Sequence, residues 1–157
     1  MPAPTPPDPS LSPLVQEILK DVPQLTRLFR QSEYRPEHLL ATMLHRGQGS
    51  AIQILRDLGV DLIDLSLALE AKIDAGELSP EGPIASSPEA DRIIKASREA
   101  AQSLGKPEAD TEHLLLALLQ FDSIARGVLH QFKLDEAAVR EKIAPGSASS
   151  ASKISQT

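Results

Sequence analysis

Two short motifs hold most of the side chains that could do chemistry in this 157-residue chain. Glu37-His38 and Glu112-His113 each place a carboxylate beside an imidazole, and a serine precedes both glutamates by the same interval, at Ser12 and Ser87. Serine, histidine and a carboxylate are the components of a hydrolytic triad, so their meeting between two segments is conceivable. Neither serine has the G-x-S-x-G context of a hydrolase nucleophile, and helix-capping roles account for all three residue types. We therefore predict that the chain is not an enzyme.

Histidines are the remaining candidate metal ligands, because the chain has no cysteine. The missing cysteine also excludes disulfides, thiolate zinc sites and iron–sulfur clusters. His38 and His45 could share a helix face, but no His-x-x-x-His or Glu-x-x-His spacing occurs. We predict no metal and no cofactor. We interpret His38 and His113 as side chains at helix starts that bond a neighbouring helix or loop.

The charge balance and the hydropathy pattern exclude further classes of partner. The chain has 16 Lys and Arg against 22 Asp and Glu, a formal net charge of −6, which argues against nucleic acid as the main partner. No apolar run approaches the length that a membrane-spanning helix needs. The first ten residues lack the basic and apolar regions of a secretory signal. We expect a cytoplasmic protein, and its scarcity of aromatic residues favours helices over a sandwich or barrel.

The two motifs belong to a tandem repeat of about 70 residues. One constant shift along the chain aligns Glu37-His38-Leu39-Leu40 with Glu112-His113-Leu114-Leu115, and Ser12-Pro13 with Ser87-Pro88. After the loss of one residue, Val60-Asp61 aligns with Leu134-Asp135. Ordered matches over a whole unit indicate duplication, and two packed copies can share a continuous core.

Each repeat is predicted to form four helices, so that the fold is all-α with eight helices and the repeats are related by a pseudo-twofold axis. Ser87 and Pro88 are suited to the N-cap and the first position of a helix, and Gly105 to its end. Thr111 is expected to cap the next helix. In repeat one, Pro23 falls inside the first helix and predicts a kink or a break near Asp21–Pro23.

Composition sets the expected boundaries. Six of the 13 prolines lie between Met1 and Pro13, and the last residues are rich in serine and alanine. We predict a disordered tail over 1–11, a domain over 12–144 and a disordered tail over 145–157. Within the domain, repeat one spans 12–73, a linker 74–86 and repeat two 87–144.

The paired Glu-His-Leu-Leu motifs resemble the double repeat at the N-terminus of Clp-type AAA+ unfoldases, the ClpA, ClpB and ClpC group. The resemblance covers Ser12 to about Ile143. It implies a non-catalytic module that docks protein substrates or adaptor proteins for a hexameric ATP-driven ring. No G-x-x-x-x-G-K-[ST] phosphate loop is present, so the chain is either an excised N-domain or a stand-alone accessory subunit that binds the Clp peptidase or chaperone ring in trans.

In the ClpC-type relatives, this resemblance further implies two half-sites for phosphorylated arginine. Carried over by position, they are Glu37 with Ser12 and Glu112 with Ser87. A carboxylate suits the guanidinium and a helix N-terminus suits the phosphate. The alternative is that both glutamates only stabilise the dipole of the helix that they begin, by roughly 0.3–1 kcal/mol each.

A second candidate partner surface consists of the bulkiest side chains of repeat one, Leu28, Phe29 and Tyr34. They are either part of the core or an exposed docking patch. The chain is expected to be a monomer in isolation.

Overall fold

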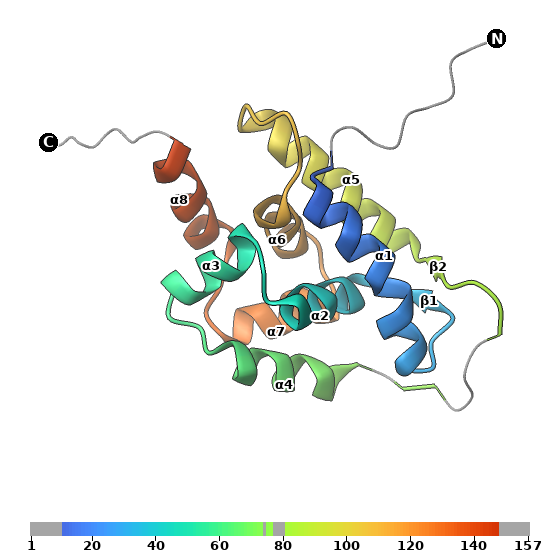
Figure 1. The fold of residues 1–157 in the computed structure, drawn as a ribbon. Helices are drawn as coiled ribbons and strands as arrows, with labels where there is room; N and C mark the ends of the chain where they lie inside the picture. The colour runs from blue at the N-terminus through green and yellow to red at the C-terminus, as the bar shows by residue number, and fades with distance from the viewer. Residues whose placement is uncertain (1–10, 74, 77–80, 148–157) are drawn as a thin grey trace, which may run out of the picture.

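The computed structural model describes residues 11–73, 75–76 and 81–147. Within these ranges the fold is all-α, as predicted, with eight helices and two strands of two residues each (Figure 1). Repeat one contains α1 (Pro13–Leu28), β1 (Glu33–Tyr34), α2 (Pro36–Arg46), α3 (Ser50–Asp57) and α4 (Leu62–Lys72). Repeat two contains β2 (Ala85–Ser86), α5 (Pro88–Ser103), α6 (Thr111–Gln120), α7 (Ile124–Gln131) and α8 (Glu136–Ser147).

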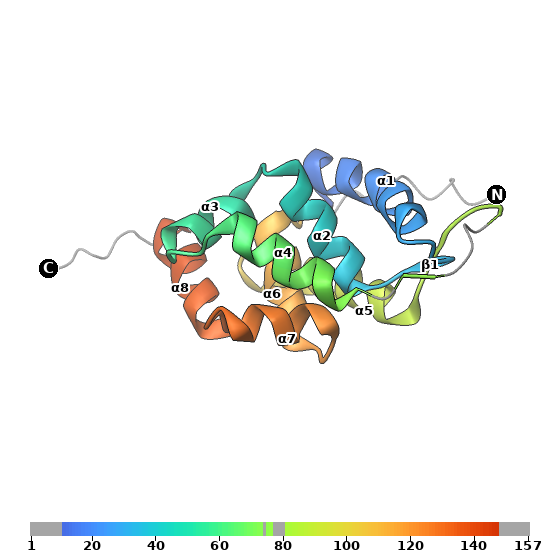
Figure 2. The ribbon, with the colours of Figure 1, turned by 90° about the horizontal axis from the view of Figure 1, so that it is seen from below.

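The core is built around α2 and α6, the helices that begin with the two Glu-His motifs. Leu39, Leu40, Leu114 and Leu115 are fully buried, and α2 and α6 lie in the middle of the bundle (Figure 1). Helices α1 and α4 pack on α2, while α5, α3 and α8 pack on α6. Helix α7 lies alongside α4 on one side of this centre, as the view from below shows (Figure 2). Apolar residues on all sides of α2 and α6 explain their burial, since a helix without a polar face needs neighbours all round.

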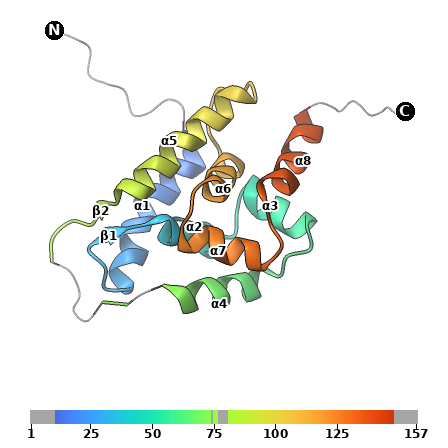
Figure 3. The same cartoon turned by 180° about the vertical axis from the view of Figure 1, so that it is seen from behind.

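The backbones of the two repeats pair with each other in two short parallel ladders. Leu11, before α1, pairs in parallel with Ala109, before α6, and the Ser12 N–H donates to the Ala109 carbonyl at 2.8 Å. In the other half Ser86, before α5, pairs in parallel with Tyr34, before α2. The second short ladder, β1 against β2, is visible from behind in Figure 3. The partners in one ladder are the repeat-aligned counterparts of those in the other, so this exchange has the pseudo-twofold symmetry that the repeat predicts.

The starts of α1 and α5 follow the predicted capping rule. Ser12 and Ser87 are the N-caps, and their hydroxyl oxygens accept the backbone N–H of Val15 at 3.1 Å and of Ala90 at 3.0 Å. A proline occupies the first turn in both helices. The expectation for α6 was wrong by one position: Asp110 is the N-cap and Thr111 begins the helix.

Pro23 does not break α1. The helix continues from Pro13 to Leu28 although proline lacks the N–H that would bond the preceding turn. Val22 and Thr26, on either side of Pro23, are fully buried, and the Thr26 hydroxyl donates to the Val22 carbonyl at 2.7 Å. The burial of this face against the core outweighs the local preference of proline.

The division of the chain into tails, repeats and linker stays a prediction, and three details of the structure bear on its boundaries. Leu11, placed in the tail over 1–11, is buried and paired with Ala109. The linker over 74–86 contains β2, and helix α8 runs to Ser147, past the predicted end at 144. Leu11 and β2 are held by pairing with the other repeat, and the end of α8 continues the helix before it, which composition does not show. The rest of the two tails, 1–10 and 148–157, and residues 74 and 77–80 of the linker lie outside the described residues.

Candidate functional site

The two Glu-His motifs form the same local structure at the starts of α2 and α6. His38 Nδ1 accepts the backbone N–H of Arg35, and His113 Nδ1 accepts the backbone N–H of Asp110, both at 2.9 Å. Each imidazole therefore satisfies an N–H just before its own helix, the half of a capping box in which histidine takes the place usual for Glu or Gln. The Arg35 side chain has no acceptor, so it cannot return this bond at the start of α2. This confirms that both histidines serve a helix start, although the bond is made within each helix start and not to a neighbouring element.

These bonds fix the protonation of both rings. Because Nδ1 accepts a hydrogen bond, the neutral ring carries its proton on Nε2. Both rings are buried; burial, with the Arg35 charge, lowers the pKa of His38 to about 4, and burial lowers the pKa of His113. Neither Nε2 has a hydrogen-bond partner among the described residues. In each motif the Nε2–H group of the histidine is therefore an enclosed donor without an acceptor among the described residues.

The helix-start serines lie beside the motif of the opposite repeat. The Ser12 hydroxyl donates to Asp110 Oδ1 at 3.1 Å, at the start of the helix that carries Glu112. The Ser87 N–H donates to the carbonyl of Tyr34 at 2.9 Å, just before the helix that carries Glu37. The resemblance pairs Ser12 with Glu37 and Ser87 with Glu112, whereas these contacts join each serine to the other motif.

Both serine side chains already have structural roles. Ser12 is 5% exposed and Ser87 is fully buried, and each hydroxyl caps its own helix. The Ser12 hydroxyl bonds a carboxylate and not an imidazole, while His113 Nδ1 bonds backbone. The hydrogen bond from nucleophile to base that a hydrolytic triad needs is therefore not formed at this junction.

A cleft opens beside each glutamate, and the two clefts differ. Glu37 is 5% exposed and lines a cavity of about 80 Å³ together with Gln31, Arg35, His38 and Ile124. Glu112 lines a cavity of about 290 Å³ between α3, α6 and α8. One of its carboxylate oxygens, Oε1, is buried without a donor among the described residues. The repeat-two cleft therefore has more room for a ligand than the repeat-one cleft.

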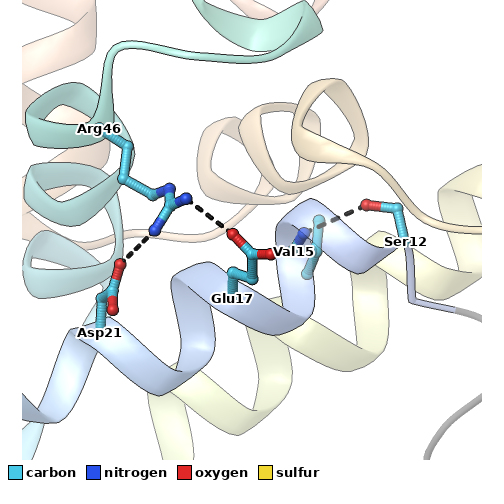
Figure 4. A network of polar contacts seen from close by, with 5 residues as sticks. All are labelled: Ser12, Val15, Glu17, Asp21 and Arg46. Carbon is cyan, nitrogen blue, oxygen red and sulfur yellow. Dashed lines mark hydrogen bonds and ion pairs between the residues drawn. The ribbon is translucent and has the colours of Figure 1, made fainter.

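An apolar groove lies between α1 and α2. It has a volume of about 200 Å³ and is lined by Leu25 and Leu28 together with the polar residues Asp21, Gln24, Thr42, His45 and Arg46. At one side Arg46 on α2 bonds two carboxylates of α1, Glu17 at 2.7 Å and Asp21 at 2.5 Å (Figure 4). This ion-pair network joins the two helices beside the groove.

The three residues of the predicted partner surface separate in the structure. Leu28 is 79% exposed, an unusual position for a large apolar side chain. Phe29 and Tyr34 pack against the core instead, and the Phe29 ring centroid is 6.1 Å from that of His38. Burial raises the pKa of the Tyr34 hydroxyl. Of the three, Leu28 is the most exposed and lies at the edge of the α1–α2 groove, while Phe29 and Tyr34 are partly buried. The three together as a partner surface stay a prediction.

Residues 11–73, 75–76 and 81–147 contain no group of three or more His, Asp or Glu that could hold a metal ion. None of the helices in the described ranges combines the length and the apolar character that crossing a bilayer requires.

Sequence reasoning missed Lys106 and Lys142, which line the repeat-two cleft. Lys106 is the counterpart of Gln31 in the repeat alignment, which therefore already contained a signal that the two clefts differ in charge. Lys142 comes from α8 and reaches the cleft only through tertiary packing. The alignment could not have placed it there.

The comparisons with known proteins agree with this fold. A family model described as the Clp repeat (R) N-terminal domain matches residues 10–132 and again 85–155. A probable ATP-dependent Clp protease ATP-binding subunit from Chlamydia pneumoniae is 36% identical over 109 residues, which are 68% of this chain and 13% of that protein. The chloroplastic chaperone protein ClpC of Pisum sativum is 31% identical over 108 residues, 68% of this chain and 12% of that protein. The matched part of the chain thus spans only a small fraction of the length of these relatives.

Solved structures show the same fold at low sequence identity. The N-terminal domain of the ClpV1 ATPase from E. coli has a TM-score of 0.71 at 20% identity, covering 84% of this chain and 82% of that domain. The ClpV N-domain in complex with a VipB peptide has a TM-score of 0.59 at 15% identity, covering 90% of this chain and 97% of that one.

Proposed function

Because the chain belongs to the family of Clp repeat (R) N-terminal domains, we propose that it is a non-catalytic protein-binding module that docks protein substrates or adaptor proteins for a Clp-type AAA+ unfoldase or protease system. The observation that carries this proposal is the apolar α1–α2 groove with Leu28 exposed at its edge. Exposed large apolar side chains beside a groove are typical of surfaces that bind partner proteins. A fold relative, the ClpV N-domain, forms a complex with a peptide, which supports the proposal.

The groove suits an amphipathic helix or an extended segment with one apolar anchor. Leu28 and Leu25 offer contact to a leucine-sized side chain, and the Arg46 network beside them offers charge to the polar face of the ligand. Burial of such an anchor contributes about 1.5–3 kcal/mol, which gives the weak, reversible binding that a docking module needs.

The test compares two apolar substitutions at exposed positions. Leu28→Ser removes the anchor of the groove, while Ile63→Ser makes the same change on α4, where Ile63 is 72% exposed. Binding of a fluorescent leucine-containing amphipathic peptide is measured by anisotropy. We expect Leu28→Ser to weaken binding about tenfold or more and Ile63→Ser to leave it unchanged. Equal binding by wild type and Leu28→Ser would remove the groove as the docking site.

An alternative within the same class is an accessory subunit that acts in trans on a peptidase or chaperone ring. Purified Clp-type AAA+ ring and purified ClpP-type peptidase ring are used as separate baits. Capture by the peptidase ring alone would identify an accessory subunit of the peptidase, whereas capture by the AAA+ ring fits both a docking domain and an accessory subunit of the chaperone ring. A monomeric, cytoplasmic protein with no nucleic-acid partner stays our prediction for either version.

The phosphoarginine half-sites remain a proposal for Glu37 and Glu112. Ser12 and Ser87 cap α1 and α5 as hydrogen-bond acceptors, so a phosphate oxygen that accepts an O–H proton would leave both caps intact. The Ser12 O–H already donates to Asp110 Oδ1, and this bond argues against Ser12 as a phosphate ligand. Titration calorimetry with free phosphoarginine on wild type and on Glu37→Gln/Glu112→Gln tests the idea. Heat with wild type that the double variant abolishes supports it, and the absence of heat with both proteins ends it.

A further inference from the structure

The larger of the two clefts is basic in a chain that is acidic overall. It lies where α3 of repeat one meets α6 and α8 of repeat two. Lys106, in the turn before α6, and Lys142, on α8, both line it and are both exposed to solvent. Ser50, the first residue of α3, also lines it, so the positive end of that helix dipole lies at the cleft. Three elements therefore contribute positive potential to one cavity of about 290 Å³.

The pseudo-equivalent cleft of repeat one lacks this pair of lysines. Its volume is about 80 Å³, and Gln31 occupies the position that corresponds to Lys106. Arg35 lines it, but that guanidinium lies 3.8 Å from the Glu33 carboxylate. Among the described residues, none from α4 lines it, although α4 is the counterpart of α8. A cavity of about 220 Å³ that shares Ile124 with this cleft is lined by Lys72 of α4. Repeat one therefore has one lysine near its cleft where repeat two has two within the cleft.

Glu112 lies among these positive groups with one carboxylate oxygen unsatisfied. Its Oε1 is buried and has no donor among the described residues, although Lys106 and Lys142 line the same cavity. Because Oε1 itself is enclosed, a ligand N–H has to approach the carboxylate from the side of the cleft that Glu112 lines. The cleft therefore presents two exposed cationic groups around one acceptor.

From this arrangement we infer that the α3–α6–α8 cleft binds an acidic peptide segment. Two of its Asp or Glu carboxylates pair with Lys106 and Lys142, and an amide N–H of the peptide donates to the Glu112 carboxylate. This inference rests on the proposed docking function but uses a surface other than the α1–α2 groove. The positive cleft in a chain of net charge −6 selects by charge, since the rest of the surface repels an acidic ligand.

The test uses a fluorescent peptide that alternates Asp and Glu with Asn, and the same peptide with Asn and Gln in place of every acid. Binding to the full chain is measured by anisotropy. Lys106→Gln/Lys142→Gln removes the two cleft charges. Lys20→Gln/Lys95→Gln removes two exposed lysines on α1 and α5 and is the matched control, because it changes the net charge equally. Glu112→Gln removes the negative charge from the cleft and keeps an oxygen acceptor.

The acidic peptide should bind at low salt and the neutral one should not. We expect Lys106→Gln/Lys142→Gln to weaken binding about tenfold and Lys20→Gln/Lys95→Gln to leave it within about twofold. Glu112→Gln removes a negative charge that repels the peptide and keeps an oxygen acceptor, so it should bind the peptide at least as tightly as wild type. Raising the ionic strength from about 0.05 M to about 0.5 M should weaken the wild-type complex and affect the cleft variant less.

Three results would overturn the inference. The first is equal weakening by the two double-lysine variants, which would indicate attraction to net charge alone. The second is no binding of the acidic peptide at low salt. The third is binding of free phosphoarginine that Glu112→Gln abolishes and Lys106→Gln/Lys142→Gln does not change, which would assign the cleft to the half-site ligand. Leu28→Ser, which tests the proposed groove, is expected to retain full binding of the acidic peptide, so failures of the two proposals are distinguishable.

Discussion

His38 and His113 occupy equivalent positions in the two repeats and make the same bond, each accepting at Nδ1 the backbone N–H three positions before it at 2.9 Å. Both are buried at the start of a central helix, and both rings must be neutral for Nδ1 to accept. The structural role of the motif therefore depends on protonation state, and the two repeats share this dependence.

This relationship predicts a loss of stability in mild acid. The pKa of His38 is lowered to about 4 in the folded chain, against about 6.5 when unfolded. The unfolded state therefore binds more protons between these values, so the free energy of unfolding falls as the pH drops from about 6.5 to about 4. His113, whose pKa is also lowered, acts in the same direction. Urea unfolding at a series of pH values from neutral down to about 4 measures the slope.

A glutamine at position 38 keeps an acceptor for the Arg35 N–H but does not titrate. His38→Gln should therefore flatten this pH dependence, while His130→Gln, at an exposed position on α7, should leave it unchanged. Identical slopes for wild type and His38→Gln would show that the bond at the start of α2 does not control acid stability.

The hydrogen bond between Thr111 and α3 allows one side-chain contact between the two repeats to be tested for its effect on stability. Its fully buried hydroxyl oxygen accepts the N–H of Ala51, at the start of α3, at 3.0 Å. Thr111→Val keeps the shape but leaves that N–H without this partner, and it should lower the free energy of unfolding by about 1–3 kcal/mol. Thr42→Val is the control, because the Thr42 hydroxyl donates to a carbonyl of its own helix. If both variants lost the same stability in urea unfolding, the contact between repeats would have no special weight.

Gly49 packs against the same threonine and should not tolerate a side chain. A Cβ there would lie 2.7 Å from Thr111 Oγ1 and 2.8 Å from Leu14 Cδ2, and its φ is +106°. Gly49→Ala should therefore cost more than about 3 kcal/mol, from backbone strain and overpacking together. Gly59→Ala, at φ +84° with no atom within 4 Å, should cost only about 1–2 kcal/mol. Thermal unfolding of the two variants checks this order, and a Gly49→Ala variant as stable as Gly59→Ala would contradict it.

Arg46 should stabilise the junction of α1 and α2 through its bonds to Glu17 and Asp21. Arg46→Gln is expected to lower the free energy of unfolding by about 1 kcal/mol, and the effect should shrink in high salt because both carboxylates are half-exposed. Arg140→Gln, which removes an ion pair within α8 only, should cost about 0.3–0.5 kcal/mol. Chemical unfolding at low and high salt separates the two, and equal costs would show that the bridge between helices adds nothing.

The features that were predicted correctly from the sequence depend on residues close together in the chain or on the repeat. The Ser-Pro pairs at Ser12 and Ser87 predict the starts of α1 and α5 because capping depends on a few adjacent residues. The constant offset between the repeats predicts the duplicated fold because both copies keep the same order of caps and apolar positions. The same rules misplaced the cap of α6, where Asp110 and Thr111 are adjacent and both able to cap.

Long-range contacts explain what could not be predicted. The pairing of Leu11 with Ala109 joins segments far apart in the chain, and no local pattern marks either of them. Pro23 is tolerated because buried neighbours hold α1 in place, an effect of tertiary packing. The repeat-two cleft is assembled from α3, α6 and α8, so Lys106 and Lys142 come together only in the folded chain.

The crossed ladders, Leu11 with Ala109 and Tyr34 with Ser86, have a consequence for the way such a chain assembles. If one repeat were made alone, both of its pairing segments would lack a partner. The segments that match them best are the equivalent segments of a second copy of that repeat. Two such fragments could dock symmetrically and rebuild the whole, so the covalent duplication replaces a homodimer and removes its dependence on concentration.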